Sequence, residues 1–197
     1  MRYGAVLTVL KVLTVLTVLT VLTVLTVLTV LKVLTARGGL IIEYMKKILF
    51  VCHGNICRSV MAEMVMRHMV TEAAREDEFV IDSCATSREE IGNDIYPPAK
   101  RCLSAHGVPF TRHAARQITK EDYANFDLIL CMEEYNIRNL RQTLGMALLE
   151  EDARKAEPKI GRLLDRDVAD PWYTGDFEAT YKDVVEGAMR LLGDEAM

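Results

Sequence analysis

The fold is organised by one stretch of sequence, Ile48-Leu49-Phe50-Val51-Cys52-His53-Gly54-Asn55-Ile56-Cys57-Arg58-Ser59. Its first four residues are continuously apolar, which is typical of a buried parallel strand. From Ser59 to about Ala74 apolar residues recur at helical spacing, so a helix follows a tight loop. Backbone N–H groups in such a loop point inward, and the helix dipole adds positive potential. This order of elements predicts an anion-binding site between the strand and the helix.

Two side chains of this loop are suited to phosphate chemistry. The Arg58 guanidinium is a planar, permanently charged fork that matches the oxygens of a phosphate. Cys52 begins the loop with its sulfur facing the anion, and the positive potential favours its thiolate form. A thiolate beneath a bound phosphate is placed for nucleophilic attack on phosphorus. We therefore predict that Cys52 is a nucleophile and that Arg58 holds the phosphate.

The other loop residues support this interpretation. Gly54 permits close approach of the backbone, and Asn55 tolerates the left-handed conformation that a sharp loop needs. Because backbone N–H groups would hold the anion, the predicted phosphate-binding residues form a continuous run: His53, Gly54, Asn55, Ile56, Cys57, Arg58 and Ser59. The alternative is a buried structural cysteine, since a cysteine followed six residues later by an arginine is weak evidence alone.

Val51 to Ser59 resembles the signature V-C-x-G-N-I-C-R-S of the low-molecular-weight protein tyrosine phosphatases. The resemblance extends from about Met45 to the C-terminus. It includes a second motif, Asp170-Pro171, at the distance where that family keeps its general acid. It implies a cysteine-dependent phosphatase without cofactor or metal, which hydrolyses phosphotyrosine in proteins through a cysteinyl-phosphate intermediate.

The general acid has to protonate the leaving oxygen and then act as base toward water. The resemblance implies that Asp170 has this role, and the proline after it rigidifies the chain. A solvated loop aspartate is the simpler reading of any single residue of this kind. Asp165, Asp167 and Asp176 lie close by in the sequence and are the competing candidates.

The resemblance also implies residues that support the loop. Ser59 would donate a hydrogen bond to the thiolate and ease its departure as a leaving group. Ser83 and His113 would join Asn55 in a network that holds the strained loop. Taken singly, these side chains are ordinary polar residues, and only the resemblance assigns them a role.

Two further roles follow from the same resemblance. Cys57 would form a reversible disulfide with Cys52 under oxidants and so protect the nucleophile. Trp172 and Tyr173 would line an aryl-phosphate cleft, where aromatic side chains stack on a phenyl ring. The family often has two tyrosines here, so Trp172 is a departure. Glu89 is another, because it stands where the family usually has an aromatic residue beside the cleft.

Three other functions remain as alternatives. An arsenate reductase shares this loop but needs a further pair of cysteines after the third strand, and no cysteine follows Cys131. A protein arginine phosphatase carries threonine where this chain has Ile56. A phosphate-binding module without catalysis has no need for a nucleophile, an arginine, a serine and an acid together.

Composition limits the remaining classes of function. Residues 45–197 carry 20 Lys and Arg against 27 Asp and Glu, so bulk charge argues against nucleic acid binding. Five cysteines, an odd number without an evident secretory signal, favour free thiols in a reducing cytoplasm over a disulfide framework. No spacing among the five cysteines and four histidines predicts a zinc site.

Residues 1–44 are unlike the rest of the chain, because ten consecutive Val-Leu-X triplets occupy residues 6–35. Residues 12–31 are uncharged and long enough for a transmembrane helix, and only then would the protein contact a membrane. A β-aggregating segment is a second interpretation, since valine and threonine are β-branched. We favour a translated DNA repeat, because the units are so regular. Met45 is then the expected start, and residues 45–197 form the phosphatase domain.

Short apolar runs alternate with amphipathic segments through residues 45–197. This pattern predicts a single doubly wound α/β domain, flavodoxin-like, with a four-stranded parallel sheet and helices on both faces. The expected strands are 47–52, 79–84, 126–132 and 159–164. The expected helices are 59–74, 97–106, a short one after Thr119, 133–144 and 177–192, with a loop over 166–176. Ligands bind beyond the carboxyl ends of such strands, where the loop at Cys52 lies.

Overall fold

The computed structural model describes residues 45–145, 154 and 158–193, so the Val-Leu-X repeat and its three interpretations lie outside the described residues. The continuously apolar run forms strand β1 (Lys46–Cys52), which is the core of a parallel sheet. β1 pairs on one side with β2 (Phe79–Ala85) and on the other with β3 (Leu128–Cys131). β4 (Ile160–Arg162) adds to β3, and the strand order is β2-β1-β3-β4.

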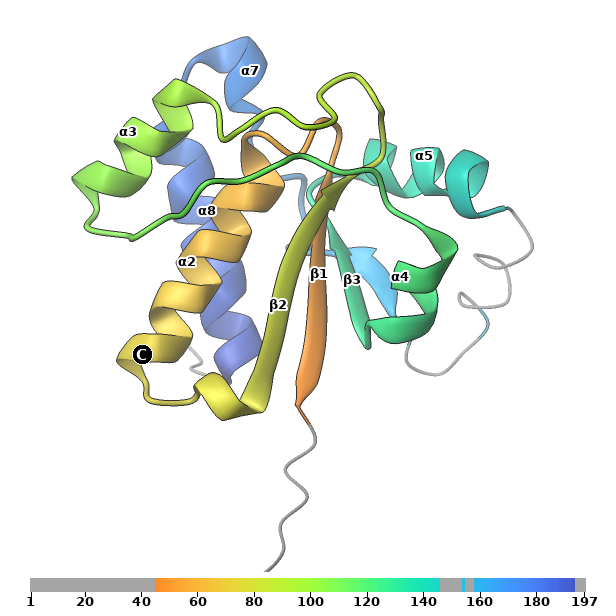
Figure 1. Cartoon of the computed structure of the whole chain (residues 1–197), viewed down its shortest axis with the longest axis horizontal. Helices are drawn as coiled ribbons and strands as arrows, with labels where there is room; N and C mark the ends of the chain where they lie inside the picture. Colours follow the sequence, from red (N-terminus) through yellow and green to blue (C-terminus); the bar gives the residue numbers. More distant parts are fainter. Residues whose placement is uncertain (1–44, 146–153, 155–157, 194–197) are drawn as a thin grey trace, which may run out of the picture. The chain divides into compact units, whose positions relative to one another are not determined.

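Helices cover both faces of this sheet (Figure 1). One face carries α2 (Arg58–Glu72), α3 (Pro97–Ala105) and α8 (Phe177–Leu192). The other face carries α4 (Lys120–Asn125) and α5 (Glu134–Leu144). A single 3-10 turn, η1 (Glu76–Glu78), precedes β2. The predicted fold class, a doubly wound α/β domain with a four-stranded parallel sheet, is therefore confirmed.

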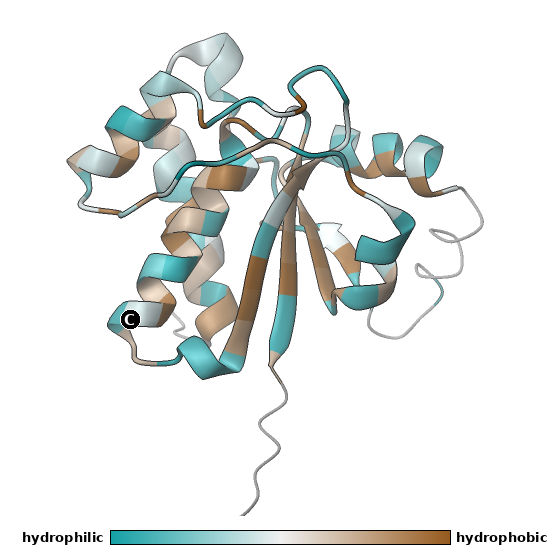
Figure 2. Ribbon diagram, in the orientation of Figure 1, coloured by the Kyte–Doolittle hydropathy of each residue, from teal (hydrophilic) through white to brown (hydrophobic). Residues whose placement is uncertain are grey.

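Alternation along β1 explains why both of its faces are apolar. Successive side chains of a strand point to opposite faces. Ile48 and Phe50 pack into the core formed with α2 and α8, whereas Leu49 and Val51 pack with Leu140 of α5. All five side chains are at most 1% exposed. Figure 2 accordingly shows hydrophobic stretches along the strands, whereas hydrophilic and hydrophobic residues are mixed along the helices.

The segment 166–176 departs from the predicted loop, because it contains the short helix α7 (Pro171–Thr174). Asp170 caps this helix by accepting a hydrogen bond from the N–H of Trp172, at 3.0 Å. Pro171 occupies the first turn, and Gly175 ends the helix with φ +72°. A carboxylate cap, an N-terminal proline and a left-handed glycine are the standard signals of a helix, here compressed into one turn. The third and fourth strands are also shorter than predicted.

One close contact fixes α8 against the end of the sheet. A side chain at Gly187 would place its Cβ 2.4 Å from Leu163, which directly follows β4. Glycine therefore permits this close approach. Nearer the start of α8, the Thr180 hydroxyl donates to the carbonyl of Ala169, which precedes Asp170, at 2.9 Å. Among residues 45–145, 154 and 158–193, no helix combines the length and the hydropathy needed to cross a membrane.

Candidate active site

The loop between β1 and α2 lies at the carboxyl edge of the sheet and is anchored by three backbone hydrogen bonds. The carbonyl of Cys52 accepts from Thr86 at 2.8 Å, and that of His53 accepts from Ser87 at 3.0 Å. The carbonyl of Ile56 accepts from Tyr96 at 2.9 Å. Because these carbonyls accept hydrogen bonds from neighbouring segments, the loop is held in one conformation at the N-terminus of a 15-residue helix.

Cys52 is 3% exposed and ends β1 with its sulfur inside this loop. Its Sγ lies 3.1 Å from the Ser59 hydroxyl and accepts a hydrogen bond from the backbone N–H of Asn55 at 3.2 Å. The N–H of Asn55 donates to the sulfur, and a hydroxyl at the distance of Ser59 can donate to it as well, so both groups are placed to stabilise negative charge there. Ser59 therefore has the contact that the family resemblance implies for it.

Asn55 holds the loop in a conformation that most residues avoid. Its φ is +59°, in the left-handed region, and the residue is fully buried. The side-chain amide donates to Ser59 at 3.0 Å and to Ser83 at 2.8 Å. Its Oδ1 lies 3.1 Å from Nε2 of His113 and accepts the N–H of Arg116 at 3.2 Å. The structure thus brings Asn55, Ser59, Ser83 and His113 together in one network.

The network continues to a buried glutamate that the sequence did not indicate. The Ser83 hydroxyl donates to Oε2 of Glu63 at 2.6 Å, and Oε1 of Glu63 accepts from Nε of Arg67 at 3.0 Å. Glu63 is 6% exposed, so its charge is compensated by these two partners. Because Glu63 lies on α2 and Ser83 on β2, the contact ties the helix of the loop to the neighbouring strand.

Arg58 is 3% exposed and directs its guanidinium into the loop region. Nη2 meets two carboxylates, Oε1 of Glu133 at 2.9 Å and Oδ2 of Asp170 at 2.6 Å. Nη1 is buried without a hydrogen-bond partner among the described residues. Burial alone would lower the pKa of Arg58, but Cys52, Glu133 and Asp170 outweigh it and raise that pKa above its usual value. The guanidinium stays charged and keeps a donor free for an anion.

The structure separates Asp170 from the three competing aspartates. Asp170 lines the cavity at the loop and contacts Arg58. Asp165 pairs with Arg190 at the surface, and Asp176 caps α8 by accepting from the N–H of Ala179. Asp167 accepts from the N–H of Glu134 and pairs with Arg162. None of these three residues lines the cavity.

A cavity of about 340 Å³ opens above the loop. Its floor is formed by residues 52–58, and Asp170, Glu133 and aromatic side chains form its walls. The aromatic residues are well exposed: Tyr135 at 55%, Trp172 at 56% and Tyr173 at 86%. Trp172 packs against Tyr96, with ring centroids 5.3 Å apart, so one wall is fixed. The cavity thus joins a polar floor to aromatic side chains in its lining.

The rim opposite these aromatics is polar. Nε2 of His53 lies 3.0 Å from Oε2 of Glu89, and both side chains are largely exposed. His53 and Glu89 therefore pair with each other, and both line the cavity. Glu90 lines the same side, where its side chain lies 3.1 Å from the position that a Cβ on Gly54 would take. A Cβ at position 54 would therefore press on the Glu90 side chain, which would have to shift by a few tenths of an ångström.

Cys57 is 7% exposed and packs with Ile56 and Ala115. Burial, followed by the charges of Cys52 and Asp170, raises the pKa of its thiol to about 12. Cys57 is therefore a neutral thiol beside the nucleophile, and all five cysteines are free.

Sequence reasoning missed three residues of this site: Glu63, Glu133 and Tyr135. Glu133 and Tyr135 directly follow β3, at the same sheet edge as the loop after β1. That position was a usable signal, because the carboxyl ends of parallel strands meet at one edge. Glu63 gave no such signal, since an i,i+4 glutamate–arginine pair on a helix is usually solvent-exposed.

Comparisons with known proteins agree with this geometry. The family model described as low molecular weight phosphotyrosine protein phosphatase matches residues 47–196. A curated pig protein named low molecular weight phosphotyrosine protein phosphatase is 44% identical over 151 residues, which cover 73% of this chain and 91% of that protein. The Bacillus subtilis protein YfkJ, named as a low molecular weight protein-tyrosine-phosphatase, is 36% identical over 75% of this chain and 94% of its own length.

Solved structures show the same relationship. The crystal structure of Bacillus subtilis YfkJ has a TM-score of 0.68 at 35% identity, and the match covers 80% of this chain and 95% of that one. A Drosophila protein described as an arginine phosphatase has a TM-score of 0.63 at 30% identity, over 75% of this chain and 96% of that one.

Proposed function

The chain belongs to the low molecular weight phosphotyrosine protein phosphatase family, whose members are cysteine-dependent phosphatases. From that premise we propose that it hydrolyses phosphotyrosine in proteins, with Cys52 as nucleophile, Arg58 as phosphate ligand and Asp170 as general acid. One observation carries this assignment: these three side chains line a single cavity of about 340 Å³ that aromatic residues also border.

In the first step the Cys52 sulfur attacks phosphorus, and the bond from phosphorus to the phenol oxygen breaks. The loop N–H groups and the Arg58 guanidinium hold the three equatorial oxygens and stabilise the charge that spreads over them. The carboxylic acid of Asp170 gives its proton to the leaving phenol oxygen. The products are cysteinyl-phosphate, free tyrosine in the protein and an Asp170 carboxylate.

In the second step a water molecule attacks the cysteinyl-phosphate. The Asp170 carboxylate takes a proton from that water, and the sulfur leaves as a thiolate. The donors from Ser59 and the Asn55 N–H, at 3.1 and 3.2 Å from Sγ, stabilise the departing charge. Inorganic phosphate is released, and every group returns to its starting state without a metal or a cofactor.

The substrate class is set by how far the sulfur lies from the surface. Cys52 is 3% exposed at the floor of the cavity, whereas Trp172 and Tyr173 stand at its rim. A phosphotyrosine ring spans this depth and lies against aromatic walls. A phosphoserine side chain is too short to bring its phosphorus to the sulfur while the peptide backbone stays outside.

The partners that we propose are therefore proteins that carry phosphotyrosine, without a role for nucleic acid. We also propose the reducing cytoplasm as the compartment. The five free cysteines support this, because the nucleophile works as a thiolate and a reducing environment preserves it.

The decisive experiment measures phosphate release by the purified full chain from phosphotyrosine, phosphoarginine and phosphoserine peptides of matched sequence, beside Cys52→Ser. We expect release from phosphotyrosine alone and its loss in the variant. Preference for phosphoarginine would overturn the substrate assignment and point to the activity of the Drosophila neighbour. No release from any peptide would leave a phosphate-binding module, or a reductase that needs an external thiol.

A further inference from the structure

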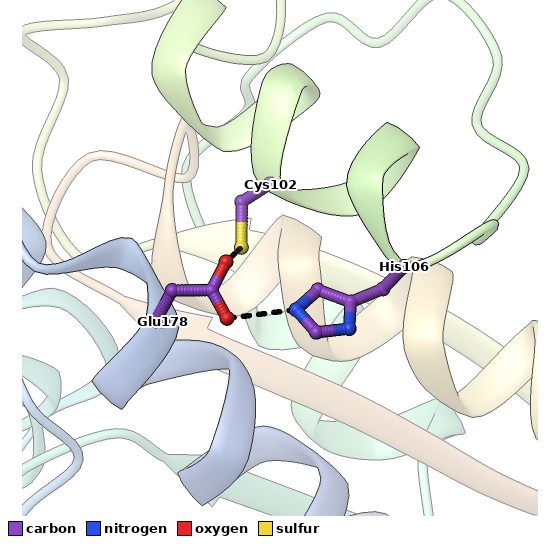
Figure 3. A group of neighbouring side chains, drawn as sticks. All are labelled: Cys102, His106 and Glu178. Atoms are coloured by element: carbon purple, nitrogen blue, oxygen red, sulfur yellow. Dashed lines mark hydrogen bonds and ion pairs between the residues drawn. The ribbon is translucent and has the colours of Figure 1, made fainter.

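A second cluster of reactive side chains lies outside the cavity at Cys52, between α3 and α8 (Figure 3). Nε2 of His106 lies 2.8 Å from Oε2 of Glu178, and Sγ of Cys102 lies 3.4 Å from Oε1 of the same carboxylate. One potential ligand atom from each residue falls within 4.8 Å of the other two. Sulfur, imidazole nitrogen and carboxylate oxygen thus converge on one point of the surface.

The fold explains this convergence. Cys102 and His106 are four residues apart at the C-terminal end of α3, so both side chains lie on one face. Glu178 belongs to the first turn of α8, which packs against α3. The third ligand is more than seventy residues away in sequence, and spacing alone therefore does not reveal the cluster.

The His106 ring is held in place. It stacks on Tyr181 with ring centroids 3.7 Å apart and an interplanar angle of 11°, and its Nε2 faces Glu178 (Figure 3). A ring fixed by stacking loses little freedom when it binds a ligand. Cys102 is 6% exposed, and its thiol donates toward the Glu178 carboxylate and the Phe177 carbonyl, at 3.4 and 3.5 Å.

We propose that Cys102, His106 and Glu178 form a Zn²⁺ site that joins α3 to α8. Zn²⁺ is the divalent ion that combines thiolate, imidazole and carboxylate ligands in tetrahedral sites, with three protein ligands and a water as one common form. At bond lengths of about 2.0–2.3 Å, the ligand atoms of such a site are about 3.3–3.8 Å apart. The observed separations are close to these values: 2.8 Å from Nε2 to Oε2, 3.4 Å from Sγ to Oε1, and no more than 4.8 Å among the three ligand atoms.

Open space lies beside two of the three proposed ligands. A hollow of about 510 Å³ borders Cys102 and Glu178. The surrounding charges do not select the ion, because they are of both signs. The negative charge of Asp176 lies near Cys102, and the positive charge of Lys182 lies near Glu178. The donor set makes the selection, because a thiolate excludes hard ions such as Mg²⁺ and Ca²⁺. On binding, the Cys102 thiol releases its proton to solvent, and any proton on Nε2 of His106 is released with it. Bonds to the metal then replace the contact between His106 and Glu178.

Co²⁺ is the probe for this site, because it takes the place of Zn²⁺ and its spectrum reports sulfur ligation and tetrahedral geometry. The full chain is titrated with Co²⁺ in the Cys52→Ser background, since the catalytic thiol is the other plausible sulfur ligand. We expect one equivalent to give a sulfur-to-cobalt charge-transfer band and intense visible bands. Zn²⁺ should bleach both, and it should raise Tm in the same background.

Variants distinguish a three-ligand site from binding at a single thiol. Cys102→Ser should remove the charge-transfer band, and His106→Gln and Glu178→Gln should each weaken Co²⁺ affinity at least ~10-fold. The matched control is His53→Gln, which removes the other histidine–carboxylate pair and should leave the titration unchanged. A band that survives Cys102→Ser, or that is insensitive to both His106→Gln and Glu178→Gln, would overturn the proposal. So would the absence of any band in the Cys52→Ser background.

Discussion

Oδ2 of Asp170 lies 2.6 Å from Nη2 of Arg58, so the proposed general acid and the proposed phosphate ligand are in direct contact. The other oxygen of Asp170 accepts the N–H of Trp172 and caps α7. Glu133 approaches the same Nη2 from the other side at 2.9 Å. When a phosphate dianion binds the guanidinium, it competes with the Asp170 carboxylate. This competition favours the protonated acid, which is the form that the first step requires.

Replacement of the acid should therefore affect the first step in a specific way. Asp170→Asn keeps an oxygen to cap α7 but has no proton to give, so kcat on phosphotyrosine should fall by about 10²–10⁴. The loss should be much smaller for aryl phosphates whose phenols are strongly acidic, because these leave without protonation. The measurement is kcat for a series of aryl phosphates, plotted against the pKa of the leaving phenol.

Asp167→Asn is the matched control, since Asp167 is an aspartate of the same segment that pairs with Arg162 outside the cavity. It should leave the dependence on leaving group unchanged. Equal losses for acidic and weakly acidic phenols in Asp170→Asn would show that Asp170 positions Arg58 and does not donate a proton.

The backbone conformation of Asn55 should contribute to stability, and its side chain should contribute to activity. Asn55→Gly keeps the left-handed conformation and the backbone carbonyl that His113 contacts, but it loses the side-chain contacts to Ser59, Ser83 and His113. Asn55→Ala loses the same side-chain contacts and also adds backbone strain. We expect both variants to lose activity, because Ser59 is no longer held at the sulfur. We expect the alanine variant to be less stable than the glycine variant by about 1–2 kcal/mol. Urea denaturation of the three proteins measures this difference, and equal stability of the two variants would contradict it.

The loop and the sheet were predictable because their signals are local. A continuous apolar run, a glycine and an asparagine in a tight loop, and a helical period follow one another within residues 48–74. The observed β1 and α2 begin within one residue of the predicted starts. Helix α8 has the predicted bounds, since its apolar period ends at a left-handed glycine.

What escaped prediction depends on contacts between distant segments or on lengths below the usual range. Glu133 reaches Arg58 across 75 positions, and Glu63 reaches Ser83 across 20, so no local pattern marks either residue. The helix α7 spans four residues, too short for an apolar period, although Asp170, Pro171 and Gly175 carried its capping signals. The cluster of Cys102, His106 and Glu178 was missed because it also depends on a contact between distant segments, α3 and α8.

Oxidation should distinguish the two cysteines of the loop. Peroxide converts Cys52 to a sulfenic acid, the Cys57 thiol attacks that sulfur, and water leaves as the disulfide forms. The pKa of Cys57, at about 12, is raised first by burial and then by the charge of Cys52, and oxidation of Cys52 removes that second cause. We expect peroxide-treated wild-type protein to recover its activity with dithiothreitol, whereas Cys57→Ser should lose most of its activity permanently. Mass spectrometry should find the Cys52–Cys57 disulfide in the wild type, and sulfinic or sulfonic acid at Cys52 in Cys57→Ser.

Cys102→Ser in metal-free buffer is the control for this experiment, because Cys102 lies on α3 outside the catalytic loop. It should recover like the wild type. Full recovery of Cys57→Ser would show that another thiol, or no thiol, protects the nucleophile.

Asp94 should make the free energy of unfolding depend on pH in the acidic range. Its carboxylate pairs with Lys100 at 2.7 Å and accepts the N–H of His113 at 3.0 Å, which fixes the segment that carries the His113 ring to Asn55. These contacts, Lys100 first, lower the pKa of Asp94 to about 2. Since the unfolded value is about 3.9, the stabilisation is complete above roughly pH 4 and is lost as the pH falls through about 2.

Asp94→Asn should therefore lower the free energy of unfolding at pH 7, by no more than about 1 kcal/mol because the side chain is partly exposed. The difference from wild type should shrink between pH 4 and pH 2, and urea denaturation at several pH values measures it. Asp77→Asn, at an exposed aspartate of η1, is the matched control and should show no such convergence. If the Asp94→Asn difference were constant across this range, the carboxylate charge would not be its cause, and loss of an uncharged contact to the His113 N–H would explain it instead.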